Sequence, residues 1–242
     1  MIEIIKINKS FNGQKVLDDL DLNIEPEKIT VVIGQSGGGK SVLLKHIIGL
    51  IRPDSGQIIV DGVDITNLND KKLNEVRKKF GMLFQDAALF DSMTVGENIA
   101  FPLKEHTRLS IKEINKVVDD KLNLVGLDNV TNKMPSELSG GMRKRVGLAR
   151  AIALDPKIVL FDEPTTGLDP IMRESIEELI VSTQKRTKAT FVVISHDIES
   201  TFVIAHKVAM LYQGRIVAVG TPDEIRSSNN PFVRRFIKDL RD

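Results

Sequence analysis

The first third of the chain carries hydrophobic patterns that predict β-strands. Apolar and polar residues alternate in part over residues 2–7 and 16–24, which is typical of strands with one exposed face. The run I-T-V-V-I at 29–33 is apolar throughout and predicts a strand buried on both faces. Residues 57–65 predict a hairpin whose turn is Asp61-Gly62.

The middle of the chain, from residue 86 to 154, changes to helical spacing. The pattern predicts helices over residues 95–101, 110–124 and 142–154. Ser110 and Glu113 form a capping-box pair at the start of the second helix.

Strand patterns return near the C-terminus. Runs at 157–162 and 190–195 predict buried strands, with a helix at 170–184 between them. Residues 208–220 predict a hairpin with its turn at Gln213-Gly214. The final segment predicts a helix whose apolar side chains share one face: Phe232, Val233, Phe236, Ile237 and Leu240. The whole pattern predicts an α/β body in two halves with a helical insert.

Composition narrows the class of protein. A hydrophobic fraction of 41% and a charged fraction of 28% are ordinary for a globular protein with a sizeable core. The net charge of +1 gives no electrostatic attraction toward nucleic acid, and the lack of cysteine excludes disulfides and thiolate chemistry. No signal peptide is recognisable, and no stretch approaches the ~20 apolar residues that span a bilayer. We therefore expect any work at a membrane to depend on another chain.

A glycine-rich segment follows the buried strand at 29–33. Residues 34–41, G-Q-S-G-G-G-K-S, fit the pattern G-x-x-x-x-G-K-[ST] and open a helix. Backbone N–H groups of such a loop can surround phosphate oxygens, and the helix N-terminus adds partial positive charge. We expect Lys40 to neutralise the β- and γ-phosphates and Ser41 to reach Mg²⁺. The alternative is an ordinary tight turn from strand to helix.

Polar residues stand where other apolar runs end. Asp162 and Glu163 follow the run at 157–162, and ligands of open α/β sheets bind at such strand ends. We expect Asp162 to reach Mg²⁺ and Glu163 to polarise the attacking water. His196 ends another buried run, which favours a γ-phosphate contact over a purely structural histidine. Gln85 follows a further apolar run, and could orient water or complete the metal shell.

Together with the phosphate loop, the segment L-S-G-G at 138–141 resembles the ATP-binding cassette family, the nucleotide-binding subunits of ABC transporters. The resemblance covers essentially the whole chain. Matching segments are the Walker A motif at 34–41, the Walker B motif at 159–163, the Q-loop at Gln85, the signature at 139–141, the D-loop at 167–169 and the switch histidine at 196.

This resemblance implies the fold of a P-loop NTPase. Its parts are a RecA-like α/β core with a mostly parallel central sheet, an N-terminal antiparallel β subdomain and an inserted α-helical subdomain. The core with its β subdomain corresponds to residues 1–85 and 155–242, and the helical subdomain to residues 86–154.

The resemblance also implies the residues that act on ATP. Residues implied in nucleotide contacts, with Phe11 stacking on adenine, are Phe11, Gly34, Gln35, Ser36, Gly37, Gly38, Gly39, Lys40, Ser41, Val42, Ser139, Gly140, Gly141 and Asp169. Residues implied in catalysis are Glu163, His196, Lys40 and Gln85. Those implied as Mg²⁺ ligands are Ser41, Gln85 and Asp162.

The second glycine pair, in Ser139–Gly141, needs an explanation of its own. One ATP has one triphosphate, which residues 34–41 already hold, so a second anion-binding helix start must serve another nucleotide. In the family, two cassettes pack head to tail and each signature closes on the ATP of the other, as the logic of a C₂ dimer requires. We interpret the basic run Arg143–Arg145 that follows as a solvated helix face.

Several segments resemble the Mla/Mce branch of the family, including L-S-G-G-M-R-K-R, in which Met142 replaces the common Gln. That resemblance implies transport of phospholipid or another hydrophobic substrate, at the cytoplasmic face of the inner membrane. It implies partner permease subunits, an Mce-type lipid-binding protein outside that membrane, and no nucleic acid. The alternatives are a polar amino acid importer and a soluble ABC-type ATPase that acts on nucleic acid or the ribosome.

The segment after Gln85 is where the family docks its permease. Its apolar residues, which we interpret as a mixture of core and docking surface, are Leu89, Phe90, Met93, Val95 and Phe101.

Overall fold

The computed structural model describes residues 1–238, which form two compact units. One unit contains Met1–Arg77 and the chain from Thr190 onward, and the other contains Lys78–Ala189. The helical subdomain expected at residues 86–154 falls within the second unit, and its boundaries stay a prediction.

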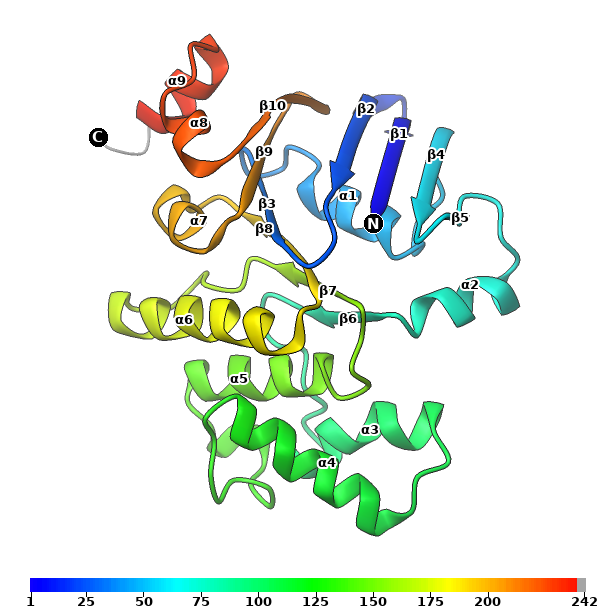
Figure 1. The fold of residues 1–242 in the computed structure, drawn as a ribbon, viewed down its shortest axis with the longest axis vertical. Helices are drawn as coiled ribbons and strands as arrows, with labels where there is room; N and C mark the ends of the chain where they lie inside the picture. The colour runs from blue at the N-terminus through cyan, green and yellow to red at the C-terminus, as the bar shows by residue number, and fades with distance from the viewer. Residues whose placement is uncertain (239–242) are drawn as a thin grey trace. The chain divides into compact units, whose positions relative to one another are not determined.

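An antiparallel sheet of the order β2-β1-β4-β5 forms part of the first unit (Figure 1). Its strands are β1 (Ile2–Phe11), β2 (Gln14–Ile24), β4 (Ser55–Val60) and β5 (Val63–Asp64). β1 continues beyond its predicted end at residue 7, because register shifts and the left-handed Lys6 (φ 47°) interrupt the alternation that marks a strand in sequence. The predicted turn between β4 and β5 is confirmed, with positive φ at both Asp61 and Gly62.

The first unit also contains buried parallel strands. β3 (Ile29–Ile33) pairs in parallel with both β8 (Thr190–Ser195) and β9 (Lys207–Tyr212), and every residue of β3 and β8 is buried, as predicted. β10 (Arg215–Gly220) turns back antiparallel to β9 through Gln213-Gly214, which confirms the predicted hairpin.

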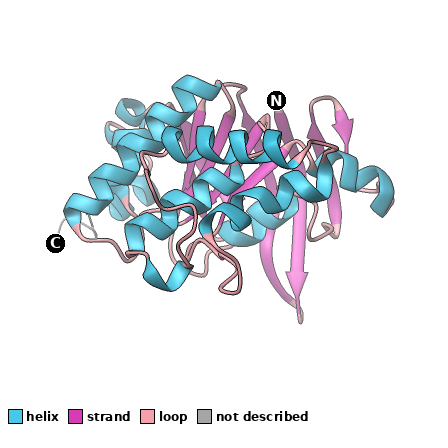
Figure 2. Cartoon of the chain, turned by 90° about the horizontal axis from the view of Figure 1, so that it is seen from below, coloured by secondary structure: helices cyan, strands magenta, loops and turns pink. Residues whose placement is uncertain are grey.

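Short helices complete the first unit, and they are among the helices drawn in cyan in Figure 2. They are α1 (Lys40–Ile47), α2 (Asp70–Arg77), α7 (Ile198–Ile204), α8 (Pro222–Arg226) and α9 (Pro231–Lys238). The sequence pattern did not predict α2, because Leu73 and Val76 are its only buried residues and form too narrow an apolar stripe to recognise. Within α9, Val233 and Phe236 are buried and Phe232 is 44% exposed, so the predicted apolar face is buried in part, and Leu240 lies outside the described residues.

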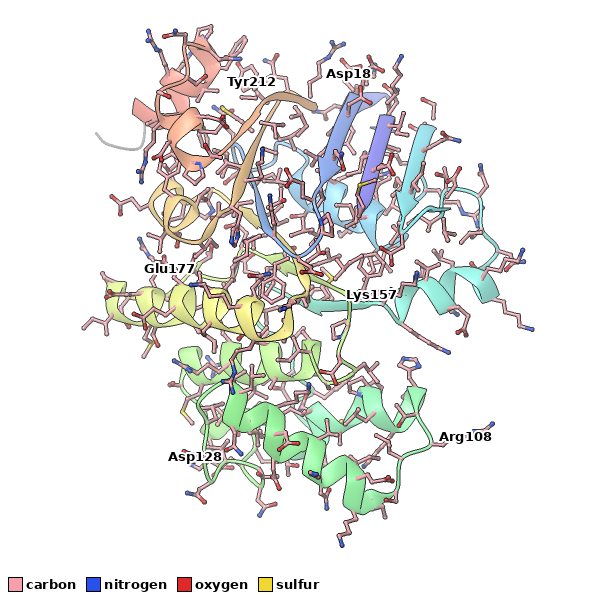
Figure 3. All side chains as sticks on the ribbon, viewed as in Figure 1. Asp18, Arg108, Asp128, Lys157, Glu177 and Tyr212 are labelled. Carbon is pink, nitrogen blue, oxygen red and sulfur yellow. The ribbon has the colours of Figure 1, made fainter. Side chains whose placement is uncertain are left out.

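β2 and the β9–β10 hairpin are joined by hydrogen bonds. Asp18 on β2 (Figure 3) accepts a hydrogen bond from Arg215 Nε at 2.7 Å, and its backbone N–H donates to the Gly214 carbonyl at 2.9 Å. Hydrogen bonds from Lys15 and then Arg215 lower the pKa of Asp18. These contacts join segments that are far apart in the sequence.

The second unit consists mainly of helices around two parallel strands. Its strands and helices are β6 (Phe80–Leu83), β7 (Ile158–Asp162), α3 (Val95–His106), α4 (Ile111–Leu124), α5 (Gly140–Ala151) and α6 (Pro170–Thr187), with a single 3₁₀ turn at Pro135–Glu137. The predicted Ser110–Glu113 capping box is confirmed at the start of α4. α3 runs past its predicted end at residue 101, because Pro102 removes only one backbone donor and Leu103 beyond it is buried.

The start of α5 differs from the sequence prediction. The helix begins at Gly140 rather than Met142, because the Ser139 hydroxyl accepts a hydrogen bond from the Met142 N–H at 3.3 Å and caps the helix. It ends at Ala151 rather than at residue 154.

Candidate functional site

At several positions, the loop between β3 and α1 has a backbone conformation or a close neighbour that only glycine allows. Gly37 (φ 74°) and Gly39 (φ 97°) are left-handed. A Cβ on Gly34 would lie 2.3 Å from the Leu211 carbonyl oxygen, and one on Gly38 would lie 2.9 Å from the Gln35 carbonyl oxygen. The loop is therefore a tightly wound cradle of backbone, which is the form that binds phosphate oxygens.

Lys40 is held against this cradle. Its side chain is 5% exposed, and its Nζ donates to the carbonyls of Gly34 at 2.8 Å and Gln35 at 3.0 Å. A buried ammonium is costly without such partners, so the loop fixes a positive charge in place. Gln35 and Ser36 are exposed at the loop, and Ser41 and Val42 lie in the first turn of α1, where the helix N-terminus favours anions. The cradle and the fixed cation fit a triphosphate.

His196 lies beside the start of the phosphate loop. β3 and β8 are neighbours in parallel, and Ile33 pairs with Ser195. Gly34 and His196 are the next residues on the two strands, and the His196 side chain is exposed there. The structure thus brings together two residues that were predicted separately to meet phosphate.

Phe11 ends β1, at the hairpin that leads into β2. Its ring is 41% exposed and lies 5.4 Å from Lys9 Nζ. β2 in turn approaches the phosphate loop, since a Cβ on Gly39 would be 3.0 Å from the Val16 carbonyl oxygen. An exposed aromatic face on this hairpin is suited to stacking on a base.

In the second unit, β6 and β7 bring the predicted carboxylates and Gln85 to one sheet edge. The strands are parallel, and Leu83 pairs with Phe161. Gln85 and Glu163 each follow the paired residue by two positions, with Asp162 between Phe161 and Glu163. Carboxylate and amide oxygens are ligands that Mg²⁺ accepts.

Glu163 has an unusual backbone. Its φ of 52° is left-handed, which costs roughly 1–3 kcal/mol for a residue other than glycine. Its carboxylate accepts a hydrogen bond from Thr166 Oγ1 at 2.8 Å, and the Thr166 N–H donates to the Glu163 carbonyl at 3.3 Å. The turn after β7 therefore fixes the direction of this carboxylate.

The glycines of the signature segment have a different character from those of the phosphate loop. Neither Gly140 nor Gly141 has positive φ, and a Cβ on either would meet its nearest neighbours, Leu168 and Met172, at 4.0 Å and 3.5 Å. Those are ordinary contacts, so neither backbone conformation nor packing within the described part of the chain requires glycine at these two positions. Glycine also suits a site where another group approaches the backbone closely.

Asp169, the last predicted nucleotide contact, caps α6. Its Oδ1 accepts a hydrogen bond from the Met172 N–H at 2.9 Å. The residue is exposed, and Gly167 before it is left-handed with φ 78°.

The interpretation of Arg143–Arg145 as a solvated helix face is wrong for two of its three residues. Arg143 is exposed, but Lys144 is 6% exposed, and Arg145 is half-buried with its Nη2 donating to Ser175 Oγ at 2.6 Å. Carbonyl and hydroxyl acceptors that only the folded unit provides make burial of these cations possible. Lys144 stands four residues before Leu148, so the two side chains lie on the same face of the helix, and Leu148 is buried. This spacing was the sequence signal that Lys144 could also be buried.

An apolar groove lies on the second unit, with a volume of about 300 Å³. Among its lining residues, Phe90 is 42% exposed and contacts Phe101, with 5.0 Å between ring centroids. Arg150 also lines the groove, and its guanidinium donates to the carbonyls of Ala87 at 2.7 Å and Ala88 at 2.8 Å. Val95, by contrast, is fully buried. The apolar segment after Gln85 thus divides into core and exposed surface.

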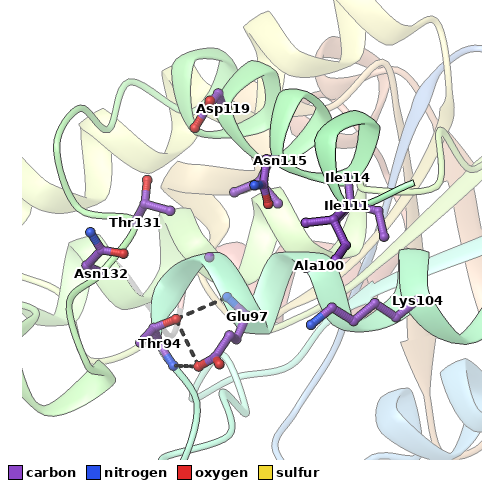
Figure 4. A pocket seen from close by; sticks show the side chains of 12 residues that line it. Thr94, Glu97, Ala100, Lys104, Ile111, Ile114, Asn115, Asp119, Thr131 and Asn132 are labelled. Atoms are coloured by element: carbon purple, nitrogen blue, oxygen red, sulfur yellow. Dashed lines mark hydrogen bonds between the residues drawn. The ribbon is translucent and has the colours of Figure 1, made fainter. Parts of the chain in front are cut away.

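A larger cavity, of about 520 Å³, is formed by α3 and α4 (Figure 4). Thr94 and Glu97 at its edge form a capping box, and hydrogen bonds from Thr94 lower the pKa of Glu97. None of the residues predicted to contact nucleotide lines this cavity.

No cluster of metal-binding side chains is found among residues 1–238, and none of their helices is long and apolar enough to cross a bilayer. Mg²⁺ in nucleotide sites commonly uses one or two protein ligands together with substrate phosphates, so it does not need such a cluster.

Comparison with known proteins gives consistent matches. The sequence profile of the ABC transporter family matches residues 17–166. A probable ribonucleotide transport ATP-binding protein, mkl, of Mycobacterium leprae is 43% identical over 99% of this chain and 69% of its own length. The intermembrane phospholipid transport system ATP-binding protein MlaF of Haemophilus influenzae is 42% identical over 100% of this chain and 92% of its own.

Solved structures are similar as well. The dimeric ATP-binding cassette MJ0796 in a post-hydrolysis state with ADP and Pi matches with a TM-score of 0.83 and 30% identity, over 92% of this chain and 99% of that one. The cassette cbiO1 of Clostridium perfringens, part of the transporter complex cbiONQ, matches with a TM-score of 0.87 and 29% identity, over 99% of this chain and 96% of that one.

Proposed function

This chain belongs to the ABC transporter family, and we propose that it powers phospholipid transport through a partner permease by hydrolysing ATP at sites shared between two copies of itself. The P-loop NTPase fold and the activity of an ATP hydrolase follow from that membership. The residue roles, the sharing of the site and the substrate are our proposals.

The proposed roles follow from the groups that each unit presents. The loop 34–41 would bind the triphosphate, with Lys40 neutralising its charge and His196 contacting the γ-phosphate. Glu163 would polarise the attacking water, and Gln85 would orient it. Phe11 would stack on adenine.

Mg²⁺ is proposed as the metal of this site. Ser41, Asp162 and Gln85 are the residues that would hold it, since hydroxyl, carboxylate and amide oxygens are the hard ligands it prefers. When bound, it would neutralise charge that develops on the phosphate oxygens.

The signature glycines carry the proposal of a shared site. Ser139, Gly140 and Gly141 present a capped helix N-terminus, yet neither backbone angles nor neighbours among residues 1–238 require glycine at position 140 or 141. A γ-phosphate bound by a second copy would account for both features, because a small residue lets the phosphate approach backbone N–H groups. The related cassette MJ0796 is dimeric. Asp169, near the signature, would line the same interface.

The transported substrate is proposed from the relatives. MlaF of Haemophilus influenzae acts in phospholipid transport, and this chain covers 92% of its length, against 69% of the mkl protein named for ribonucleotide transport. We therefore favour phospholipid, with an Mce-type lipid-binding protein outside the membrane as a further partner. This chain would then sit peripherally on the cytoplasmic face of the inner membrane. The 43% identity to mkl makes ribonucleotide transport the second candidate.

Purification of the tagged chain with its native membrane partners tests this assignment. We expect an integral membrane permease and bound phospholipid, measured by mass spectrometry of the extract, at levels above those on an unrelated membrane complex purified in the same detergent. Ribonucleotides other than ATP and ADP, or an amino acid-binding protein without bound lipid, would contradict the phospholipid assignment.

The apolar groove is proposed as the docking surface for the permease. Phe90→Asp is expected to reduce recovery of the permease about tenfold or more, because a charge replaces an exposed aromatic anchor, while the affinity for ATP changes less than about twofold. Val63→Asp is a matched control, since Val63 is 40% exposed on the antiparallel sheet and Phe90 is 42% exposed. Equal recovery of the permease by wild type and Phe90→Asp would show that Phe90 does not anchor it.

A further inference from the structure

Lys144 lies within α5 and makes contacts that the ATP chemistry described above does not use. Its Nζ donates to the Pro164 carbonyl at 2.7 Å and to the Thr166 carbonyl at 2.8 Å. The side chain is 6% exposed, and burial lowers the pKa of Lys144, although the charges of Asp86 and Glu163 oppose that shift. A buried cation is thus bound to two carbonyls of one short turn.

That turn is the one that carries Glu163. Pro164 and Thr166 stand one and three residues after Glu163, and the Thr166 hydroxyl donates to the Glu163 carboxylate at 2.8 Å. The left-handed backbone at Glu163 is unfavourable for a residue other than glycine, so it persists only if the surrounding contacts stabilise it. Two charge-assisted hydrogen bonds from a fixed helix are suited to holding it, since they are about twice as strong as neutral ones.

We propose that Lys144 is a positioning residue for ATP hydrolysis, which binds the Pro164 and Thr166 carbonyls from the signature helix and so fixes the direction of the Glu163 carboxylate. The proposal rests on the role given to Glu163 under the proposed function. Lys144 would act on hydrolysis only through this turn. Its loss lets the turn relax toward ordinary backbone angles, and the Thr166 hydroxyl then moves with it.

The test compares steady-state ATP hydrolysis by the assembled transporter with several variants of Lys144. Lys144→Met keeps an unbranched side chain without a donor, and we expect kcat to fall about tenfold or more while KM for ATP changes less than about twofold. Lys144→Arg is expected to restore kcat to within about threefold of wild type, because a guanidinium can donate to two carbonyls.

Lys121→Met is the matched control. Lys121 is also a buried lysine of the second unit, 8% exposed, but its Nζ pairs with Asp155 and contacts no residue of the Glu163 turn. It should lower the melting temperature without changing kcat more than about twofold. A loss of kcat in Lys121→Met equal to that in Lys144→Met would overturn the positioning role, because both losses would then reflect stability alone.

Comparing Glu163→Gln with Lys144→Met separates a failure of the Lys144 inference from a failure of the proposed function. If Glu163→Gln is inactive while Lys144→Met retains normal kcat, the inference about Lys144 is wrong and the proposed function stands. If Glu163→Gln itself turns over normally, the proposed role of Glu163 fails first. Should Lys144→Met not fold, Lys144→Gln decides, because its shorter amide reaches at most one of the two carbonyls. We expect it to lose kcat about threefold, and an unchanged kcat would contradict the proposal.

Discussion

Glu163→Gln is expected to bind ATP with nearly unchanged affinity and to hydrolyse it at least about 100-fold more slowly than wild type. The amide has almost the same shape, so the hydrogen bond with Thr166 and the left-handed turn can persist. What the amide lacks is the negative charge that polarises the attacking water and the basicity that accepts its proton. Release of inorganic phosphate measures turnover, and binding of a fluorescent ATP analogue measures affinity.

Glu178→Gln provides the control for this change. Glu178 is an exposed carboxylate on α6, so the same substitution there should leave both turnover and ATP affinity within about twofold of wild type. Normal turnover in Glu163→Gln would remove Glu163 from the mechanism, and a parallel loss of ATP binding would mean that its role is in holding the nucleotide.

The second large effect concerns the sharing of the site between chains. Homodimers of Ser139→Arg and homodimers of Lys40→Ala should both be nearly inactive. The first has an arginine in place of Ser139 at both of its sites, and the second lacks the phosphate-loop lysine at both of its sites. A heterodimer of the two keeps one complete site, made from Lys40 of the first chain and Ser139 of the second. Random mixing in equal amounts makes half the dimers mixed, each with one of two sites, so about a quarter of wild-type activity is expected if the sites act independently.

The mixture of variants separates the shared site from its alternatives. Activity that appears only on mixing requires that groups from two chains meet at one ATP. Full activity of either homodimer would show that each chain contains a complete site, and a mixture as inactive as its parents would mean that one intact site cannot turn over alone. The measurement is phosphate release as the ratio of the two chains is varied at fixed total concentration.

Parts of the fold that depend on local sequence were predictable. The strands at 29–33 and 190–195 have the predicted bounds, because a strand buried on both faces needs an apolar residue at every position. The phosphate loop was recognisable because its glycines are required by the backbone itself. The tight hairpin turns were predictable for the same reason.

Two features of α5 were not predicted, one that is local and one that depends on tertiary contacts. Glycine has low helix propensity, so the sequence favoured a start of α5 at Met142, whereas the Ser139 cap begins the helix at Gly140. Lys144 belongs to a basic run that is typical of solvated helices. Only the folded unit shows the Pro164 and Thr166 carbonyls that its ammonium binds.

The candidate site also has features that the sequence predicted and features that it did not. Motif spacing gave the identity of residues such as Gln85 and Glu163, and parallel strand pairing explains why they share a sheet edge. The left-handed backbone of Glu163 has no sequence signal, since the turn that holds it is built from carbonyl groups. The spare room around Gly140 was equally invisible, although it is the feature that points to a second chain.

The molecular mass of Glu163→Gln in solution, measured with and without saturating ATP and Mg²⁺, tests the shared site most directly. Slow hydrolysis should trap the ATP-bound pair, so the mass should rise from that of one 26.9 kDa chain to twice that value when ATP is added. Adding Ser139→Arg to the same chain should prevent the rise. A mass of one chain in saturating ATP, or a pair that forms equally well with Ser139→Arg, would contradict the account.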